Sequence, residues 1–450
     1  MALDRKTGSM LLLVVALLLS GCWNGDNGTH GPSNEKGAGT LPTQQLVTLT
    51  FWRNSGNNAE NTAYDTLIAK FMELHPDIRI EMQPFPFADY DTKLRTAIAA
   101  GNPPDIMSVD APSLASYAQA GALLPLTEQY QRNGNLEDIP ESTMDGYTYL
   151  DDIYLAPMTE SSIAMFYNIP LFEAAGIPLP SQDPEEAWTW EQVLDAAIRI
   201  NDPDNGIYGI DPAQGFQNAG ATAYFKYPII WQFGGEVMDA TGTTARGALD
   251  SPETKRAIAF YAGLFTEYKV AQFEYPLDAF PNRQLGITID GTWTLAQIAQ
   301  KYPDFKLGVD FGVAPLPKGT RQAVANGSWA LGISAATRYP EQAWTFINWM
   351  SSHEGLMLYS SIIKDIPARY SVAKQFKELN EYPLNIFVVQ NQKYGRPRPM
   401  TPIFPQMAEA VKVLFEEVTL EKRNIDEAVE AAVIRIDKAY ADSQRLVGNE

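Results

Sequence analysis

The sequence predicts an α/β fold built on a parallel, doubly wound sheet, and three observations within residues 46–110 support this prediction. Apolar side chains alternate along LVTLTFW and again along IRIEMQ, as they do in β-strands. Between these segments, and again before PDIMSVD, apolar residues recur at the three- and four-residue spacing of a helix. The order strand, helix, strand, helix, strand requires two right-handed crossovers, which make the three strands parallel.

Each element of this segment has its own signal. In the first strand, Val47, Leu49 and Phe51 lie on one face. The first helix ends before His75-Pro76, because proline disfavours helical backbone in the residue that precedes it. The predicted elements are a strand at 46–52, a helix at 60–74, a strand at 78–82, a helix from about 90 to a glycine stop at 101, and a strand at 105–109.

Polar or aromatic side chains follow two of these strands where the chain leaves the sheet. Trp52 and Asn54 come at the end of the first strand, and Asp110 follows the third. Open parallel sheets bind ligands beyond the carboxyl ends of their strands. Trp52, Asn54 and Asp110 are therefore the first candidates for ligand-binding residues.

The rest of the chain alternates extended segments with helical runs. A capping box opens one helix, since Thr189 can accept from a free backbone amide while Gln192 can reach back. The extended segment at 161–168 is expected to cross from one lobe to another. Helices are predicted at 114–120, 190–200, 251–268, 293–301, 340–350, 353–360, 372–379, 405–418 and 425–442, and extended segments at 152–157, 161–168, 284–290, 307–313 and 330–334.

The composition limits the size, partners and chemistry of the protein. Its 450 residues, 45% of them hydrophobic, suggest two or three domains with large cores. The net charge of −20 argues against a nucleic-acid partner, whose phosphates require Lys and Arg. With one cysteine, three scattered histidines and no catalytic or nucleotide-binding motif, we expect no enzymatic activity, no metal and no cofactor.

The first 45 residues resemble a bacterial lipoprotein leader followed by a tether. Arg5 and Lys6 precede an apolar run at 10–19 that is too short to span a bilayer, and LSGC ends at the sole cysteine, Cys22. The resemblance implies a signal peptide at 1–21 and lipidation of Cys22, with a secretory peptide that happens to contain Cys22 as the alternative. Residues 22–45 have the composition of a flexible tether. We therefore expect a lipid-anchored protein on the extracytoplasmic face of the cell membrane, at the cell surface or in the periplasm.

Several segments between residues 46 and 433 together resemble the family 1 extracellular solute-binding proteins of ABC importers, the group that includes the maltose-binding protein. The segments are GNPPDIMSVDAPSLASYAQAGALLPL, AMFYNIPLFEAAGI with TWEQ after it, WQFGGE, GITIDGTW, APLPKG, GSWALGISAAT, YPEQAWTFINWMSS and GRPRPMTPIFPQ. The resemblance implies a two-lobed, type II periplasmic-binding-protein-like fold with a hinge and an interlobe cleft. We assign 46–157 and 320–370 to the N-terminal lobe, and 158–319 and 371–450 to the C-terminal lobe.

A sugar presents hydroxyl pairs and an apolar ring face, so its pocket needs planar acceptors, forked donors and aromatic plates. Asp110 suits the acceptor role, with a helix N-cap as the alternative. The resemblance implies that Trp293, after GITIDG, stacks on the sugar, and Trp231, ahead of a Gly-Gly pair, is a second aromatic candidate. The strand-start candidates are Gly327, Ser328 and Trp329.

Two charged candidates come from the resemblance alone. Glu160 matches the family's acidic residue at the edge of the cleft, and Thr159 and Ser161 remain alternatives for that position. In GRPRP, Arg396 resembles the forked donor to sugar hydroxyls. Arg398 could instead hold the hinge, and the sequence does not separate the two arginines.

The resemblance implies a monomeric receptor that captures a mono- or oligosaccharide and delivers it to the transmembrane subunits of an ABC permease. The GRPRP segment favours a disaccharide of the maltose or trehalose kind. A receptor for a non-sugar polar solute such as glycerol phosphate remains an alternative within the same fold. From other classes, a surface-anchored glycoside hydrolase would need two suitably spaced carboxylates, and a receptor for a metal or polyamine would need histidine, tyrosine or several more acids.

Overall fold

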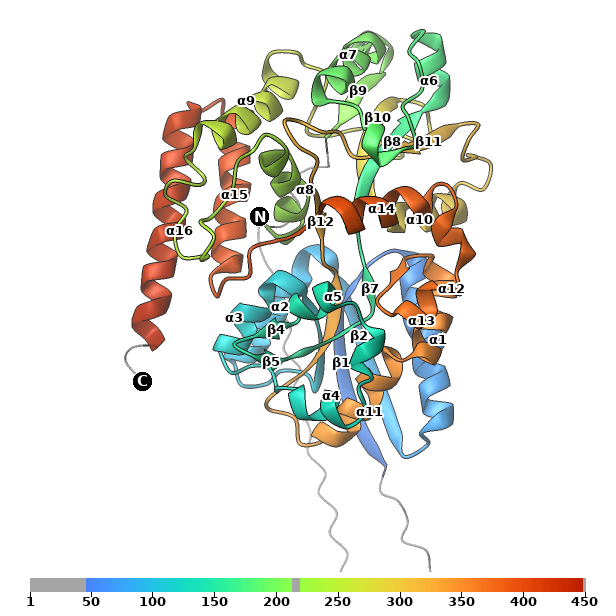
Figure 1. Ribbon diagram of the computed structural model, residues 1–450, viewed down its shortest axis with the longest axis vertical. Coiled ribbons are helices and arrows are strands. Elements are labelled where there is room, and N and C mark those ends of the chain that lie inside the picture. The colour runs from blue at the N-terminus through green and yellow to red at the C-terminus, as the bar shows by residue number, and fades with distance from the viewer. Residues whose placement is uncertain (1–45, 213–218, 448–450) are drawn as a thin grey trace, which may run out of the picture. The chain divides into compact units, whose positions relative to one another are not determined.

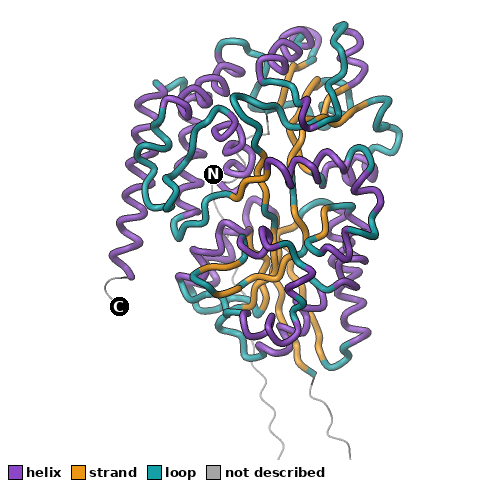
Figure 2. Tube along the Cα trace, viewed as in Figure 1, coloured by secondary structure: helices purple, strands orange, loops and turns teal. Residues whose placement is uncertain are grey.

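The computed structural model describes residues 46–212 and 219–447, all within one compact unit that begins at Gln45. The predicted signal peptide at 1–21, the predicted tether at 22–45 and Cys22 therefore lie outside the described residues. Figures 1 and 2 show two groups of strands, one around β1 and β2 and the other around β8 and β10, each covered by helices. We refer to the two groups with their helices as the first and second lobes.

The first lobe is built on a five-stranded sheet in the order β2-β1-β3-β13-β6. Strand β1 pairs in parallel with β2, where Val47 lies opposite Ile78, and in parallel with β3, where Phe51 lies opposite Ile106. The predicted parallel arrangement is therefore confirmed. The strands are β1 (Val47–Ser55), β2 (Ile78–Pro86), β3 (Ile106–Asp110), β6 (Leu155–Pro157) and β13 (Trp329–Ile333), with a hairpin of β4 (Thr148–Tyr149) and β5 (Asp152–Ile153) beside them.

Helices pack on this sheet through the apolar faces that the sequence predicts. Phe71 on α1 contacts Phe346 on α11 edge to face, with ring centroids 5.0 Å apart, and Phe346 also contacts Phe51 of β1. Asn57 caps α1 by accepting from the Glu60 amide. The helices of this lobe are α1 (Asn58–Leu74), α2 (Phe87–Ala99), α3 (Leu114–Gln119), α4 (Thr127–Asn133), α5 (Glu141–Asp145), α11 (Pro340–Met350), α12 (His353–Ile363) and α13 (Tyr370–Ala373).

The second lobe is built on a four-stranded sheet in the order β11-β8-β10-β9, in which β10 runs parallel to β9 and antiparallel to β8. The capping box at Thr189 and Gln192 is present at the start of α7, as predicted. The strands are β8 (Ile163–Asn168), β9 (Tyr208–Asp211), β10 (Leu285–Gly291) and β11 (Phe311–Ala314). The helices are α6 (Ile169–Ala174), α7 (Trp190–Ile200), α8 (Ala219–Gln232), α9 (Pro252–Thr266), α10 (Trp293–Lys301), α14 (Leu384–Tyr394), α15 (Phe404–Thr419) and α16 (Ile425–Val447).

Two short ribbons lie where the chain passes between the lobes. Strand β7 (Thr159–Glu160) pairs with β14 (Ile366–Pro367), and β12 (Val324–Asn326) pairs with β15 (Gly395–Pro397). The chain leaves the first sheet at Pro157 and enters the second at Ile163. On the return, Val324 and its neighbours 323 and 325 pack in the second core, so the crossing follows them instead of starting at Thr320.

Several parts of the chain differ from the prediction. The predicted helix at 372–379 is α13, which ends at Ala373, and a separate 3-10 helix at Lys377–Asn380, and helices α4 and α5 were not predicted. The aromatic-rich region forms α8 over its described residues 219–232; this helix is buried nearly all round and so has no amphipathic pattern to reveal it. Helix α14 was also not predicted. The predicted strand at 307–313 begins only at Phe311, because the Asp310 carboxylate accepts from the backbone amide of Lys306 (2.8 Å) and closes a turn there.

Between residues 46 and 447, the described part holds no helix with the length and hydrophobicity needed to cross a membrane.

Candidate functional site

Four of the predicted site residues lie at one edge of the first sheet. Trp52 and Asn54 are near the end of β1, and Asp110 ends β3 opposite Trp329 of β13. Tyr90 supports this edge from α2: its hydroxyl donates to the Ser108 carbonyl (2.7 Å), and its ring packs against Trp329 at 5.7 Å. The parallel sheet thus brings together residues that are far apart in the sequence.

Asp110 is held by a buried guanidinium. Both Nη atoms of Arg398 donate to the two carboxylate oxygens of Asp110, at 2.7 and 2.6 Å, and the Arg398 side chain is only 2% exposed. The guanidinium also lies 5.0 Å from the ring centroid of Tyr224 on α8. Asp110 makes no side-chain capping hydrogen bond to the following helical turn. Its side chain therefore links β3 of the first lobe to the segment after β15 and, through Arg398, to α8 of the second.

Tyr224 continues this polar network toward the crossing segment. Its hydroxyl shares a hydrogen bond with Ser161 (2.9 Å), and Ser161 in turn donates to the carbonyl of Gly327 (2.8 Å). Gly327 has a φ of +87°, a conformation that favours glycine. The next residue, Ser328, accepts from the Ala111 amide through its carbonyl (3.2 Å). The crossing segment that contains Ser161 is therefore joined to the one that contains Gly327 by a hydrogen bond.

Trp293 lies beside this network on the second lobe. Its ring centroid is 6.1 Å from that of Tyr224 and 6.4 Å from that of Phe225. Its carbonyl accepts from the side-chain amide of Asn57 (3.3 Å), which belongs to the first lobe. Trp293 is half-buried.

Arg396 and Trp231 are placed differently from the prediction. Trp231 is 2% exposed and belongs to the core of the second lobe, because α8 is buried on nearly every side. Arg396 lies 4.9 Å from the Trp231 ring centroid and pairs with both carboxylate oxygens of Glu236, at 2.9 and 3.2 Å. Trp231 therefore has a packing role in this structure, and of the two arginines it is Arg398 that pairs with Asp110.

Two acidic side chains lie on the ribbon formed by β7 and β14. Glu160 is 9% exposed, burial raises its pKa, and its Oε2 atom has no hydrogen-bond partner. Asp365 directly precedes Ile366, which pairs with Glu160 across the ribbon. Burial raises the pKa of Asp365 to about 7, and the carboxylates of Glu60 and Glu160 add to the effect. The hydroxyl of Thr292, next to Trp293, donates to Asp365.

Sequence reasoning missed Asp365 and did not prefer Arg398. Asp365 lies in none of the segments that carry the family resemblance, and the only signal is a pair of charged residues, Lys364 and Asp365, between the apolar pairs of IIKDIP. Thr159 and Ser161, the alternatives to Glu160, are both buried, and Ser161 makes the bonds described above. The position of Asp365 depends on the pairing of β7 with β14, about 200 residues apart.

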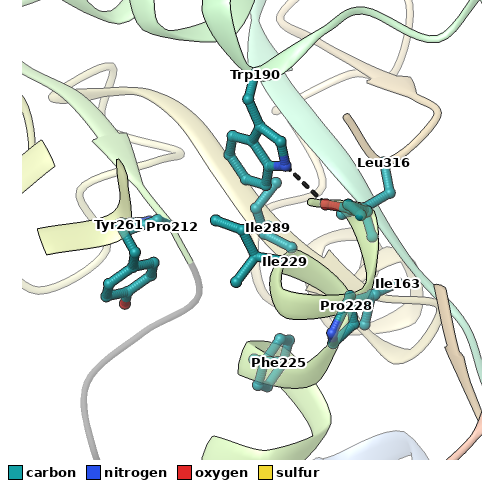
Figure 3. A pocket seen from close by; sticks show the side chains of 10 residues that line it. Ile163, Trp190, Pro212, Phe225, Pro228, Ile229, Tyr261, Ile289 and Leu316 are labelled. Atoms are coloured by element: carbon teal, nitrogen blue, oxygen red, sulfur yellow. Dashed lines mark hydrogen bonds between the residues drawn. The ribbon is translucent and has the colours of Figure 1, made fainter. Parts of the chain in front are cut away.

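Two cavities lie away from these residues. Figure 3 shows one of about 10 Å³ inside the second lobe, where the Trp190 indole N–H donates to the side-chain oxygen of Gln232 (2.6 Å). It has room for about one water molecule. A groove of about 800 Å³ lies between α1 and α12, lined by residues such as Ala69 and Trp349. Neither the cavity nor the groove is lined by a predicted site residue.

Among the described residues, no group of three or more His, Cys, Asp or Glu side chains could hold a metal ion.

Asp365→Asn should stabilise the protein more at pH 8 than at pH 5. Folding raises the pKa of Asp365 from an ordinary 3.8 to about 7. Between these values the folded chain binds more protons than the unfolded chain, so stability falls as the pH rises through this window. Asparagine can still accept from Thr292 but cannot ionise. We expect the melting temperature to rise by about 3 °C at pH 8, measured by differential scanning calorimetry.

The control for this prediction is Asp65→Asn, which removes a carboxylate from an exposed position on α1. It should change the melting temperature little at either pH. If Asp365→Asn changes stability by the same amount at pH 5 and pH 8, the carboxyl group does not titrate in this window and the prediction is wrong.

Comparison with known proteins shows that this chain is similar to solute-binding proteins. The family model described as bacterial extracellular solute-binding protein matches residues 55–357. The maltotriose-binding protein of Pyrococcus abyssi is 25% identical over 313 residues, which cover 68% of this chain and 62% of that protein. The mannitol-binding protein of Pseudomonas aeruginosa is 26% identical over 335 residues, which cover 72% of each chain.

Solved structures are similar over most of the chain. An ABC transporter solute-binding protein from Thermotoga lettingae, bound with α-D-tagatose, superimposes with a TM-score of 0.78 and 27% identity. The match covers 88% of this chain and 100% of that one. The predicted two-lobed α/β fold is thereby confirmed.

Proposed function

Because this chain belongs to the bacterial extracellular solute-binding protein family, we propose that it captures a carbohydrate outside the cytoplasm for an ABC importer. The aligned region spans less than two thirds of the maltotriose-binding protein, so the substrate and the permease partner are both part of this proposal. The proposed ligand is a mono- or oligosaccharide, with a maltose- or trehalose-type disaccharide as the first choice.

One observation carries the proposal: the buried pair of Asp110 and Arg398 contacts Tyr224, which packs beside Trp293, and Asp110 lies opposite Trp329 in the first sheet. Tyr224 and Trp293 come from the second lobe, and Trp329 from the first. The Asp110 carboxylate, held by Arg398, can accept further hydrogen bonds from sugar hydroxyls, and aromatic faces suit the apolar ring face of a sugar. The carbohydrate names or ligands of the relatives support the same class.

In the proposed mechanism the lobes close on the ligand by bending at the β7–β14 and β12–β15 ribbons. Such short paired segments are suited to a hinge, because they connect two rigid cores with few residues. Ligand that contacts both lobes favours the closed state by its differential affinity. We propose no catalysis, since binding the unreacted sugar is the whole task of a receptor.

We further propose that Cys22 is lipidated and that residues 22–45 tether a monomeric receptor to the extracytoplasmic face of the membrane. The LSGC sequence after a basic and apolar lead supports this. Labelling with a radioactive fatty acid, compared between the native chain and Cys22→Ser, tests the anchor independently of the ligand.

A thermal-shift screen tests the proposed ligand class. Ligand that binds only the folded chain raises its melting temperature, by an amount that grows with concentration. We expect at least one neutral sugar, among maltose, trehalose, maltotriose, mannitol and tagatose, to stabilise the chain. Stabilisation by glycerol phosphate, a peptide or a cation, with no response to any carbohydrate, would contradict the proposal. Release of product from labelled maltodextrins would favour the hydrolase alternative.

A further inference from the structure

We infer that Glu160 and Asp365 make the ligand site selective by charge: it accepts neutral and amine-bearing sugars and rejects sugars that carry a carboxylate or phosphate. This inference rests on the proposed function, because it specifies the class of sugar that the same site takes. It concerns two side chains on the β7–β14 ribbon, which lies where the chain passes between the lobes.

The two carboxyl groups are neighbours across the β7–β14 ribbon. Glu160 lies on β7 opposite Ile366, and Asp365 immediately precedes Ile366. The Asp365 carboxyl group accepts from Thr292, which is adjacent to the proposed stacking residue Trp293. Glu160 is adjacent to Ser161, which bonds to Tyr224 and to Gly327. Asp365 is thus hydrogen-bonded to the neighbour of Trp293, and Glu160 is next in sequence to the residue that bonds to Tyr224.

The neighbouring charges do not neutralise this pair. Glu60 has Arg53 at 3.3 Å and Asp110 has Arg398 at 2.6 Å. The groups that act on Asp365 are the Thr292 hydroxyl, the carboxylates of Glu60 and Glu160, and the backbone amide of Ile366. Those that act on Glu160 are Thr143 and the backbone amide of Gly327. Within the described chain no cation pairs with either acid, so an anion brought to this ribbon meets uncompensated negative charge.

Two buried oxygens beside this ribbon have unused hydrogen-bonding capacity. The Oε2 atom of Glu160 has no partner, although the residue is only 9% exposed. Ser162, which is fully buried, also has an unpartnered hydroxyl, and its carbonyl accepts from the Thr292 amide (3.3 Å). A carboxylate oxygen can only accept, so the group that satisfies it must donate. Hydroxyl and ammonium groups donate, whereas an ionised carboxylate or phosphate cannot.

The donor groups at the site do not reverse this preference. Both Nη atoms of Arg398 already bind Asp110, and both Nη atoms of Arg396 bind Glu236. An anionic ligand would have to displace one of these carboxylates. An ammonium group on the sugar, in contrast, would pair with Glu160 and Asp365 and would favour their ionised forms.

The test is a binding panel by isothermal titration calorimetry at pH 7.5 with the full chain. For each of the glucose, mannose and galactose series, it compares the neutral sugar with its 2-amino, uronate and 6-phosphate forms. In any series that binds, we expect the uronate and the phosphate to bind at least ten times more weakly than the neutral sugar, and the amino sugar to bind at least as tightly. High salt should reduce these ratios.

Substitutions of Glu160 and Asp365 test whether these two residues cause the difference in affinity between charged and neutral sugars. Glu160→Gln with Asp365→Asn should bring the affinities of charged and neutral sugars within about threefold, because the shape is kept and the charge is lost. Should the double variant not melt cooperatively, Asp365→Asn alone is used. Asp65→Asn, which removes an exposed carboxylate on α1, should leave the ratios unchanged.

Three results overturn the inference. The first is an anionic sugar that binds as tightly as its neutral parent, and the second is a folded double variant that keeps the native ratios. Either finding would show that the two acids do not select by charge, while leaving the receptor function intact. Binding of no sugar in any series, including the maltose and trehalose of the first screen, would remove the proposed function itself.

Discussion

Arg398→Ala should lower the free energy of unfolding by about 3–5 kcal/mol, because it leaves a buried carboxylate without its partner. Arg398 is 2% exposed and Asp110 is 14% exposed at the side chain, and the two make a bidentate pair. The variant also removes the guanidinium from the face of Tyr224. Guanidinium unfolding followed by tryptophan fluorescence measures the loss.

The matched control is Arg396→Ala, two residues earlier in the same segment. Arg396 also makes a bidentate pair, with Glu236, but both side chains are more than a third exposed. Water screens such a pair, so its loss should cost at most about 1 kcal/mol. The double variant Asp110→Asn with Arg398→Ala should lose less free energy of unfolding than the two single variants together. Asp110→Asn removes the carboxylate charge that Arg398→Ala leaves unpaired. Equal losses for Arg396→Ala and Arg398→Ala would contradict the burial argument.

Trp231→Ala should lower the free energy of unfolding by about 3–5 kcal/mol through the cavity that it leaves. The indole ring is 2% exposed, and it packs against Tyr227 with ring centroids 5.9 Å apart. Arg396, which lies over the ring, also loses this contact. Chemical unfolding with and without the best sugar of the panel separates lost stability from lost binding.

Trp293→Ala is the control for this prediction, since the same residue type is removed from a half-buried position at the junction. It should weaken sugar binding while the fold melts cooperatively with a smaller loss of stability. A Trp231→Ala variant that keeps native stability but loses sugar binding would instead support the role that the sequence resemblance implied for Trp231.

The sequence alone determined the elements whose signals are local. The period-two and helical patterns of residues 46–110 predicted β1, α1, β2, α2 and β3 in the right order and as a parallel sheet. The Thr189–Gln192 capping box fixed the start of α7. These succeed because a helix cap, a proline stop or an alternating strand is encoded within a few residues. The period-two pattern also places Trp52, Asn54 and Asp110 near the carboxyl ends of β1 and β3, where the structure has them; their binding of a ligand stays a prediction.

Only the tertiary structure decided which side chains meet. The choice between Arg396 and Arg398 depends on how the segment after β15 lies against β3, almost 300 residues earlier. The burial of Trp231 depends on α8 being enclosed on nearly every side, and the place of Asp365 depends on the pairing of β14 with β7. Residue type and spacing give a side chain's chemistry, but burial and long-range pairing determine whether that chemistry is used for packing, for an ion pair or for a ligand.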